Sequence, residues 1–253
     1  MKSISILGCG WLGKALAVAL LNKGYLVKGS TTTMAKIEVL RKLGIQPFLI
    51  DLAIAKNIND FLNTDVLIVA ITHKELNDFK GLIERIEKSS VNRIIYSSTT
   101  SVYPSLNKVT TEEDETLETI HFKIEELFRN SINFKTTVVR FAGLFGGERH
   151  PANWFTNGRK IPQPNGFVNM IHLDDCIGIL MRIIEKDCFG ALFNACADHH
   201  PTRKEFYTYV KESNNLPTPE FEKNEALAWK IVSSKKVQKA LNYTFKHKNL
   251  LAI

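Results

Sequence analysis

The amino-acid sequence predicts an α/β fold, with a doubly wound parallel sheet, helices on both faces and a small C-terminal helical lobe. Near-continuous apolar runs of strand length alternate with amphipathic helical patterns over residues 3–140, which is typical of parallel strands buried on both faces. The first of these runs leads into a glycine-rich turn and a helix. The loop-rich composition that begins near Phe145 predicts the lobe.

The first strand and helix enclose the glycine turn. Residues 3–7 form the apolar run, and Gly8, Gly10 and Gly13 follow with G-x-G-x-x-G spacing. A helical pattern then extends to Lys23-Gly24, and a second strand covers 25–29. Strand, glycine turn, helix and strand in this order predict a dinucleotide-binding Rossmann unit.

Each glycine of the turn has its own physical role. Gly8 permits the tight turn, Gly10 leaves room for a pyrophosphate, and Gly13 lets helix and strand pack closely. The first helical residues, Trp11 and Leu12, then present backbone N–H groups to the diphosphate at the positive end of the helix dipole. The alternative is a glycine turn that serves helix packing in a domain that binds no dinucleotide.

The residues after the second strand favour NADP(H) over NAD(H) as the cofactor. A site for NAD(H) usually carries Asp or Glu about 20 residues after the turn, whereas a 2′-phosphate needs hydroxyls and a cation. No carboxylate precedes Glu38, while Ser30, Thr31, Thr32 and Lys36 supply hydroxyls and charge. The same hydroxyls are also typical of an ordinary loop that caps the next helix.

Further strands and helices continue the alternation. The expected strands cover 47–52, 65–70, 93–97, 136–140 and 191–194, and the expected helices cover 117–129, 174–185, 202–213 and a segment from Ser233 or Ser234 to Leu241. We expect one dinucleotide-binding domain over 1–253, with a small substrate lobe formed by about 147–170 and 201–253. Because α/β sheets bind ligands outside the carboxyl ends of their strands, we expect the site in the cleft between sheet and lobe.

Composition restricts the class of protein. The chain has 253 residues, 44% of them hydrophobic, and a net charge of +7 with acidic and basic residues interspersed, so we expect neither disorder nor nucleic-acid binding. The longest apolar runs are far shorter than the roughly 20 residues of a membrane helix, and we expect no signal peptide. Four cysteines without metal spacing are typical of reduced thiols in a cytoplasmic protein. The expected partner is a small molecule, and a homodimer is compatible with the sequence.

Several segments together resemble the extended short-chain dehydrogenase/reductase superfamily, in particular its NAD(P)-dependent epimerase/dehydratase family. Residues 97–104 resemble a serine-rich signature that ends in Val-Tyr-Gly, residues 139–146 an Arg-x-x-x-x-x-Gly motif, and residues 171–175 a His-x-x-Asp motif. The order and spacing match over residues 3–213. The Gly-x-Gly-Trp-Leu-Gly turn is similar to that of a bacterial epimerase/dehydratase type.

The resemblance implies positions for cofactor and substrate. It places Asp51 and Leu52 beside the adenine, and it assigns Ala70, at the end of the fourth strand, to the cofactor site. Thr99, which follows the fifth strand, matches the family's Ser or Thr that orients the substrate hydroxyl or carbonyl.

The family's proton-transfer pair is missing from this chain. In the family a Tyr-x-x-x-Lys pair follows the fifth strand, and its lysine lowers the pKa of the phenol, but residues 118–126 contain no tyrosine. Tyr207 and Lys211 have the Tyr-x-x-x-Lys spacing, but they lie far beyond the helix that follows the fifth strand. They suit the apolar face of a helix in the lobe. His121 is a candidate general acid and Tyr103 a candidate residue of the substrate cleft, the alternatives being a surface histidine and a packing tyrosine.

Neither histidine motif predicts a metal site. We expect His172 and Asp174 to cap the helix that starts there, and His199-His200 has no cysteine or carboxylate at ligand spacing.

The sequence leaves two candidate functions. One is an NAD(P)-dependent oxidoreductase or epimerase acting on a small carbonyl or nucleotide-sugar substrate, and the other is a non-catalytic NAD(P)(H)-binding redox sensor.

Overall fold

The chain divides into two compact units. A computed structural model describes residues 2–54, 58–156, 158–223 and 227–252. Unit 1 comprises Met1–Ser98, Glu118–Val139 and Leu180–Leu192, and unit 2 comprises Thr99–Leu117, Arg140–Ile179 and Phe193–Ile253. Unit 2 thus includes the segments expected to form the lobe, together with the segment after the fifth strand.

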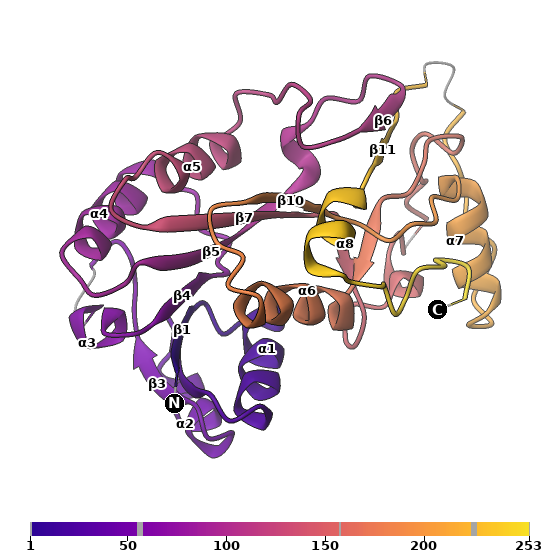
Figure 1. The fold of residues 1–253 in the computed structure, drawn as a ribbon. Coiled ribbons are helices and arrows are strands. Elements are labelled where there is room, and N and C mark those ends of the chain that lie inside the picture. Colours follow the sequence, from indigo (N-terminus) through magenta and orange to yellow (C-terminus); the bar gives the residue numbers. More distant parts are fainter. Residues whose placement is uncertain (1, 55–57, 157, 224–226, 253) are drawn as a thin grey trace. The chain divides into compact units, whose positions relative to one another are not determined.

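A parallel seven-stranded sheet is the central element (Figure 1). Its strands are β1 (Ser3–Leu7), β2 (Leu26–Thr31), β3 (Gln46–Leu49), β4 (Val66–Val69), β5 (Arg93–Thr99), β7 (Lys135–Phe141) and β10 (Leu192–Ala195), in the order β10-β7-β5-β4-β1-β2-β3. The order runs outward in both directions from β1 and β4. This confirms the predicted doubly wound α/β fold, in which the direction reverses at a ligand-binding switch point.

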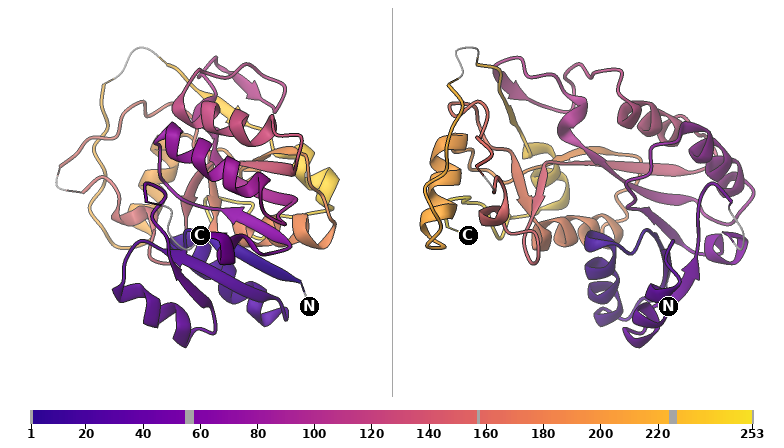
Figure 2. Two further views of the ribbon diagram at one scale, coloured as in Figure 1. Left: turned by 90° about the vertical axis from the view of Figure 1, so that its left-hand side faces the viewer. Right: turned by 180° about the vertical axis from the view of Figure 1, so that it is seen from behind.

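Helices of unit 1 cover both faces of its part of the sheet (Figures 1 and 2). They are α1 (Trp11–Asn22), α2 (Ala35–Lys42), α3 (Ile58–Leu62), α4 (Leu76–Glu87) and α5 (Ile120–Arg129). Because crossovers between parallel strands are right-handed, reversing the direction of strand addition moves the helices to the other face. Apolar side chains of α3, α4 and α5 share one core with the strands, with Phe61, Phe79 and Phe128 fully buried.

Local sequence explains these elements. All four residues of β4 are buried, as expected of a strand covered on both faces. Helix α1 ends before Gly24, whose φ of +82° is a left-handed conformation that glycine adopts without strain.

The third strand is shorter than predicted. β3 ends at Leu49, and the following Asp51 accepts a hydrogen bond from the backbone N–H of Ala53 through Oδ1, at 3.1 Å. Asp side chains favour such turns over continued pairing. Asp51 and Leu52 therefore lie in a turn, beyond the strand that the apolar run predicted.

Unit 2 contains short strands as well as helices. Its elements are β6 (Lys108–Thr110) paired in parallel with β11 (Lys230–Val232), β8 (Gly143–Phe145) paired in parallel with β9 (Met170–His172), α7 (Arg203–Glu212) and α8 (Lys235–Leu241). Helix α6 (Leu173–Glu185) runs from unit 2 into unit 1. Two single 3₁₀ turns cover Thr100–Val102 and Pro151–Asn153. The sequence predicted the helices and missed these strands, because three residues are too few to show a period of two.

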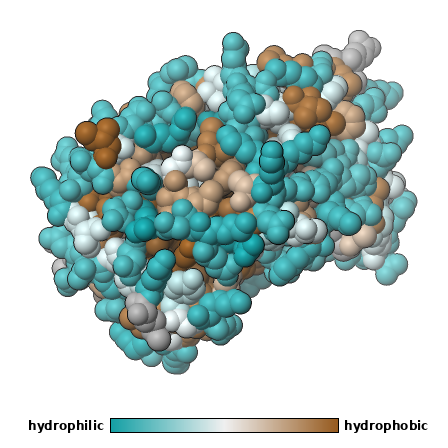
Figure 3. All heavy atoms as spheres, viewed as in Figure 1, coloured by the Kyte–Doolittle hydropathy of each residue, from teal (hydrophilic) through white to brown (hydrophobic). Residues whose placement is uncertain are grey.

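Within the described part of the chain, no helix combines the length and the hydrophobicity needed to span a membrane. On the face drawn in Figure 3, hydrophilic residues predominate and hydrophobic residues form small patches.

Candidate functional site

Two glycines of the turn are required by sterics. Gly8 has a φ of +101°, and a Cβ on it would lie 2.5 Å from Ile71 Cγ2 and 2.6 Å from the carbonyl oxygen of Ala70. A Cβ on Gly13 would lie 2.1 Å from the carbonyl oxygen of Gly8. Side chains at these positions would push the turn away from β4 and α1. Ala70 thus contributes to the turn through its backbone.

The middle glycine faces open space. No atom lies within 4 Å of a Cβ built on Gly10, whose φ of −79° any residue can adopt. Gly10 is also the N-cap of α1, and it supplies no side-chain cap to the helix. Room for a group and a helix N-terminus without a side-chain cap are what a diphosphate needs. Leu12 is buried, so its backbone is the part that a ligand could contact.

Ser30 supports the turn through two hydrogen bonds. Its Oγ accepts a hydrogen bond from the N–H of Gly8 at 2.9 Å, and its carbonyl oxygen accepts one from the N–H of Cys9 at 2.8 Å. Ser30 is 2% exposed. The side chain of Ser30 therefore stabilises the turn, and a direct bond from its hydroxyl to the cofactor stays a prediction. The neighbouring Cys9 thiol is buried, which raises its pKa to about 12.

The other hydroxyls after β2 differ in exposure. Thr31 is buried, and its Oγ1 accepts a hydrogen bond from the N–H of Thr33 at 3.1 Å. Thr32, Thr33 and Lys36 are exposed. Helix α2 has Met34 at its N-cap and no side-chain cap, so none of these hydroxyls caps the helix.

A small hollow adjoins the turn after β3. A cavity of about 210 Å³ is lined by residues of the β3–α3 segment, including Leu52 and Ala53, and by residues of α4, including Asn77. Asp51 is exposed and does not line it. A larger hollow of about 720 Å³ between α3 and α4 includes none of the predicted site residues.

The end of β5 carries two hydroxyls with different partners. Ser98 donates a hydrogen bond to Oε1 of Glu125, a carboxylate on α5 that is fully buried. Thr99, the next residue, is partly exposed, and its Oγ1 accepts a hydrogen bond from the N–H of Ser101 at 3.1 Å. A bond accepted by Oγ1 leaves the hydroxyl proton of Thr99 available to a ligand. The sequence did not indicate Glu125, because nothing in the spacing of its neighbours marks a buried carboxylate.

His121 lies one helical turn before Glu125 on α5 and is partly exposed. Burial lowers the pKa of His121 below its usual 6.5; the positive charge of Lys74 lowers it further, and the negative charge of Glu125 opposes both. Burial and the charge of Lys74 therefore both favour the neutral form of His121.

Tyr103 is enclosed by polar partners in unit 2. It is 1% exposed; Arg140 Nη1 donates to its hydroxyl at 2.7 Å, and the hydroxyl donates to Oδ1 of Asn194 at 2.9 Å. Burial raises the pKa of Tyr103. Of the two alternatives left open by the sequence, these contacts favour a packing tyrosine over a residue of the substrate cleft. Arg140 belongs to a motif recognised in the sequence, but the sequence did not indicate its partner.

The late Tyr-x-x-x-Lys pair also lies inside unit 2. Tyr207 is 6% exposed and packs edge-on against Phe155, and Lys211 Nζ donates to the carbonyl oxygen of Ala152 at 2.7 Å. Burial raises the pKa of Tyr207, whereas proton transfer by a phenol needs a lowered one.

Comparisons with known proteins support an NAD-binding domain in the N-terminal part of the chain. Residues 3–121 match the family profile described as the NAD-binding domain of 6-phosphogluconate dehydrogenase. The whole chain is 27% identical to Protein YeeZ of Escherichia coli K12, covering 99% of that protein.

Two solved structures resemble the whole fold. A functionally unknown conserved protein from Silicibacter pomeroyi has a TM-score of 0.85 and 20% identity, with 99% of this chain and 96% of that chain covered. A UDP-glucuronic acid 4-epimerase from Bacillus cereus, in complex with NAD, has a TM-score of 0.80 and 16% identity, with 98% and 95% covered. The chain therefore shares the fold of these two structures, one of which is an NAD-complexed epimerase. This likeness supports the resemblance that the sequence motifs indicated at the level of the fold. Helix α5, where the resemblance implied a tyrosine, has the sequence IHFKIEELFR and carries none.

Proposed function

We propose that this chain is an NAD(P)-dependent oxidoreductase or epimerase acting on a small carbonyl or nucleotide-sugar substrate. The observation that carries the proposal is the glycine turn, where Gly8 and Gly13 fix the backbone and Gly10 leaves open space before an uncapped helix N-terminus. When bound there, the cofactor would supply or accept the hydride. The backbone N–H groups of α1 would hold its diphosphate, and Leu52 would line the adenine pocket.

We favour NADP(H) as the cofactor. No carboxylate lies between the turn and α2 to bind a ribose 2′-hydroxyl, and Thr32, Thr33 and Lys36 are exposed where a 2′-phosphate would need donors. Ser30 and Thr31 are buried, and their side-chain oxygens accept backbone hydrogen bonds, so the exposed Thr32 and Lys36 are better placed to meet a phosphate.

Calorimetric titration tests the cofactor site. We expect NADPH to bind more tightly than NADH, and Gly10→Asp to weaken both by about 100-fold or more, since its carboxylate would stand against the diphosphate. Asn22→Asp is the matched control: Asn22 is the exposed last residue of α1, so it adds the same charge at the other end of that helix. If neither cofactor binds, or if Gly10→Asp binds like Asn22→Asp, the site is refuted.

A lysine pair tests the preference for NADPH separately. Lys36→Ala should weaken NADPH by about two- to fivefold, the range of an exposed ion pair, and leave NADH unchanged. Lys23→Ala removes an exposed lysine just after α1 and should affect neither. Equal affinity for NADH and NADPH would remove the preference without removing the site.

The group that donates a proton to the substrate can be tested separately from the cofactor site. We propose that His121, on α5 of unit 1, delivers the proton during reduction. A separate proposal is that Thr99, the first residue of unit 2, orients the substrate oxygen. A donor must be protonated, so kcat for reduction should fall as the pH rises through a pKa below 6.5. His121→Ala should remove this pH dependence, and Thr99→Ala should lower kcat by about 10²-fold or more. His150→Ala, a partly buried histidine of unit 2, is the control. An unchanged pH profile in His121→Ala would exclude His121 as the donor.

The second candidate function is a cofactor-dependent redox sensor without catalysis. The observation that favours it is that burial raises the pKa of Tyr96, Tyr103 and Tyr207, so none of these phenols is activated for proton transfer. Tight NADPH binding together with no turnover across carbonyl compounds and nucleotide sugars would support this function over the enzyme.

A further inference from the structure

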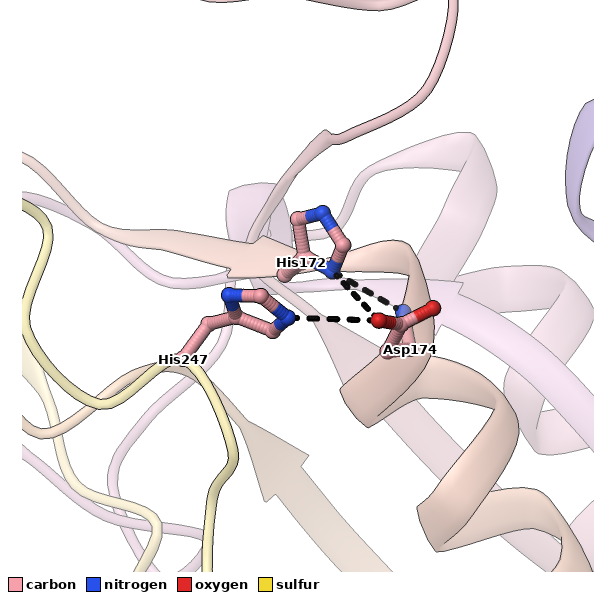
Figure 4. Close-up of side chains that lie close together, drawn as sticks. All are labelled: His172, Asp174 and His247. Atoms are coloured by element: carbon pink, nitrogen blue, oxygen red, sulfur yellow. Dashed lines mark hydrogen bonds and ion pairs between the residues drawn. The ribbon is translucent and has the colours of Figure 1, made fainter. Parts of the chain in front are cut away.

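Three side chains with metal-binding atoms converge in unit 2 (Figure 4). His172 ends β9, Asp174 lies in the first turn of α6, and His247 comes from the C-terminal segment, 73 residues after Asp174. One ligand atom from each residue lies within 4.8 Å of the other two. Sequence analysis predicted no metal site, because the two histidines are too far apart in the chain for any ligand spacing to show.

The separations suit a tetrahedral ion. His247 Nε2 lies 3.2 Å and His172 Nδ1 lies 3.6 Å from Oδ2 of Asp174. Zinc with bonds of about 2.0–2.2 Å to nitrogen and oxygen places neighbouring ligand atoms about 3.3 Å apart. Two edges of such a tetrahedron are therefore nearly formed. The side chains of His172, Asp174 and His247 are 17%, 51% and 32% exposed, so an ion and a water molecule can reach them.

The surroundings hold two of the three ligands in place. The ring of His172 packs on Gly146, where an added Cβ would lie 2.5 Å from Nε2, and edge-on against Phe145. The backbone of His247 is fixed by Asp175, whose carboxylate accepts hydrogen bonds from the N–H groups of Lys246 and His247 at 2.7 and 3.0 Å. Supporting contacts of this kind orient the ligands of metal sites.

Some interactions of these side chains oppose the binding of a metal ion and would have to change when an ion binds. The N–H of Asp174 donates to His172 Nδ1 at 3.1 Å, which is the helix-capping role expected from the sequence. The two imidazole rings lie 3.7 Å apart between centroids, so an ion must replace that hydrogen bond and turn the rings toward a common centre. Lys246 and Lys248 flank His247 with positive charge, which the carboxylates of Asp174 and Asp175 offset.

We propose that His172, Asp174 and His247 bind a divalent first-row transition ion such as Zn²⁺, with water as the fourth ligand. Two imidazoles and one carboxylate with an open position are a donor set that zinc accepts. The bound ion would tie the C-terminal segment to the start of α6. The inference does not depend on the proposed function.

Titration of the full chain with ZnCl₂ after removal of metals with a chelator tests the site. We expect one Zn²⁺ per chain, and His172→Ala, Asp174→Asn and His247→Ala should each weaken binding by at least about tenfold. His73→Ala is the matched control, because it removes the histidine of another His–Asp pair, His73 Nε2 lying 2.7 Å from Asp78 Oδ2, that has no second histidine among the described residues within ligand distance. It should bind Zn²⁺ like the original chain.

Thermal unfolding provides a second readout. Zn²⁺ at about 100 times its Kd should raise Tm by roughly 5 °C or more in the original chain and in His73→Ala, but not in His247→Ala. His247 is partly exposed, so its replacement should leave the metal-free Tm nearly unchanged. Failure to bind one Zn²⁺, or equal binding by His247→Ala and the original chain, would overturn the proposal.

Discussion

A Gly13→Ala variant is expected to lose both stability and dinucleotide binding. Its Cβ would stand 2.1 Å from the carbonyl oxygen of Gly8 and 3.1 Å from Ile6 Cγ2, so the turn and the first turn of α1 must separate. Overpacking of this kind costs about 1–3 kcal/mol. Moving the turn also misplaces the N–H groups offered to the diphosphate. Each hydrogen bond to a charged group contributes about 1.5–3 kcal/mol, so the loss of one alone weakens binding about 10- to 150-fold.

Gly10→Ala is the matched control for stability. Its Cβ meets no atom within 4 Å and its φ is negative, so urea unfolding should show a much smaller loss of free energy than for Gly13→Ala. Cofactor affinity should still fall, because the methyl group occupies the space that the pyrophosphate needs. If Gly13→Ala changes neither the free energy of unfolding nor the cofactor affinity, the close packing of helix and strand at Gly13 is not required for stability or for binding.

An Arg140→Ala variant is expected to destabilise unit 2 by about 3 kcal/mol or more. Arg140 is 1% exposed, and its guanidinium lies 4.8 Å from the centre of the Tyr103 ring and donates to the Tyr103 hydroxyl. Truncation leaves a cavity in a packed interior and removes a partner from the buried hydroxyl, and these two costs add. Urea unfolding measures the loss.

A second variant separates the hydrogen bond from the packing. Tyr103→Phe keeps the ring but removes the hydroxyl that joins Arg140 to Asn194, and it should cost about 1–3 kcal/mol. The double variant should cost less than the sum of the two, because the residues share one network. Arg41→Ala, which removes an exposed arginine paired with Glu38 on α2, should change the free energy of unfolding by less than about 1 kcal/mol. Equal effects of Arg41→Ala and Arg140→Ala would refute the role assigned to the buried network.

The contacts that form the glycine turn and those that form the buried network of Tyr103, Arg140 and Asn194 differ in their separation along the chain. The turn is formed by contacts within the first 71 residues of the chain. The network joins Tyr103 to residues 37 and 91 positions later. The spacing of residues in the sequence therefore indicates the contacts of the turn, but it does not indicate the contacts of the network.

The sequence by itself determined the parallel sheet, the positions of its strands to within a few residues, and the glycine turn. These features depend on local patterns, namely apolar runs, helical periodicity and glycine spacing, which short segments carry whatever packs against them. The short strands of unit 2 were missed because their pairing, rather than their composition, defines them.

Tertiary structure alone decided which polar side chains are free to meet a ligand. Ser30 and Tyr103 both looked available in the sequence, yet one holds Gly8, 22 residues away, and the other is enclosed by Arg140 and Asn194. His172 and His247 were unrelated in the sequence and stack in the structure. A buried hydroxyl must find a hydrogen-bond partner wherever the chain brings one, so its role depends on long-range packing that no local pattern records.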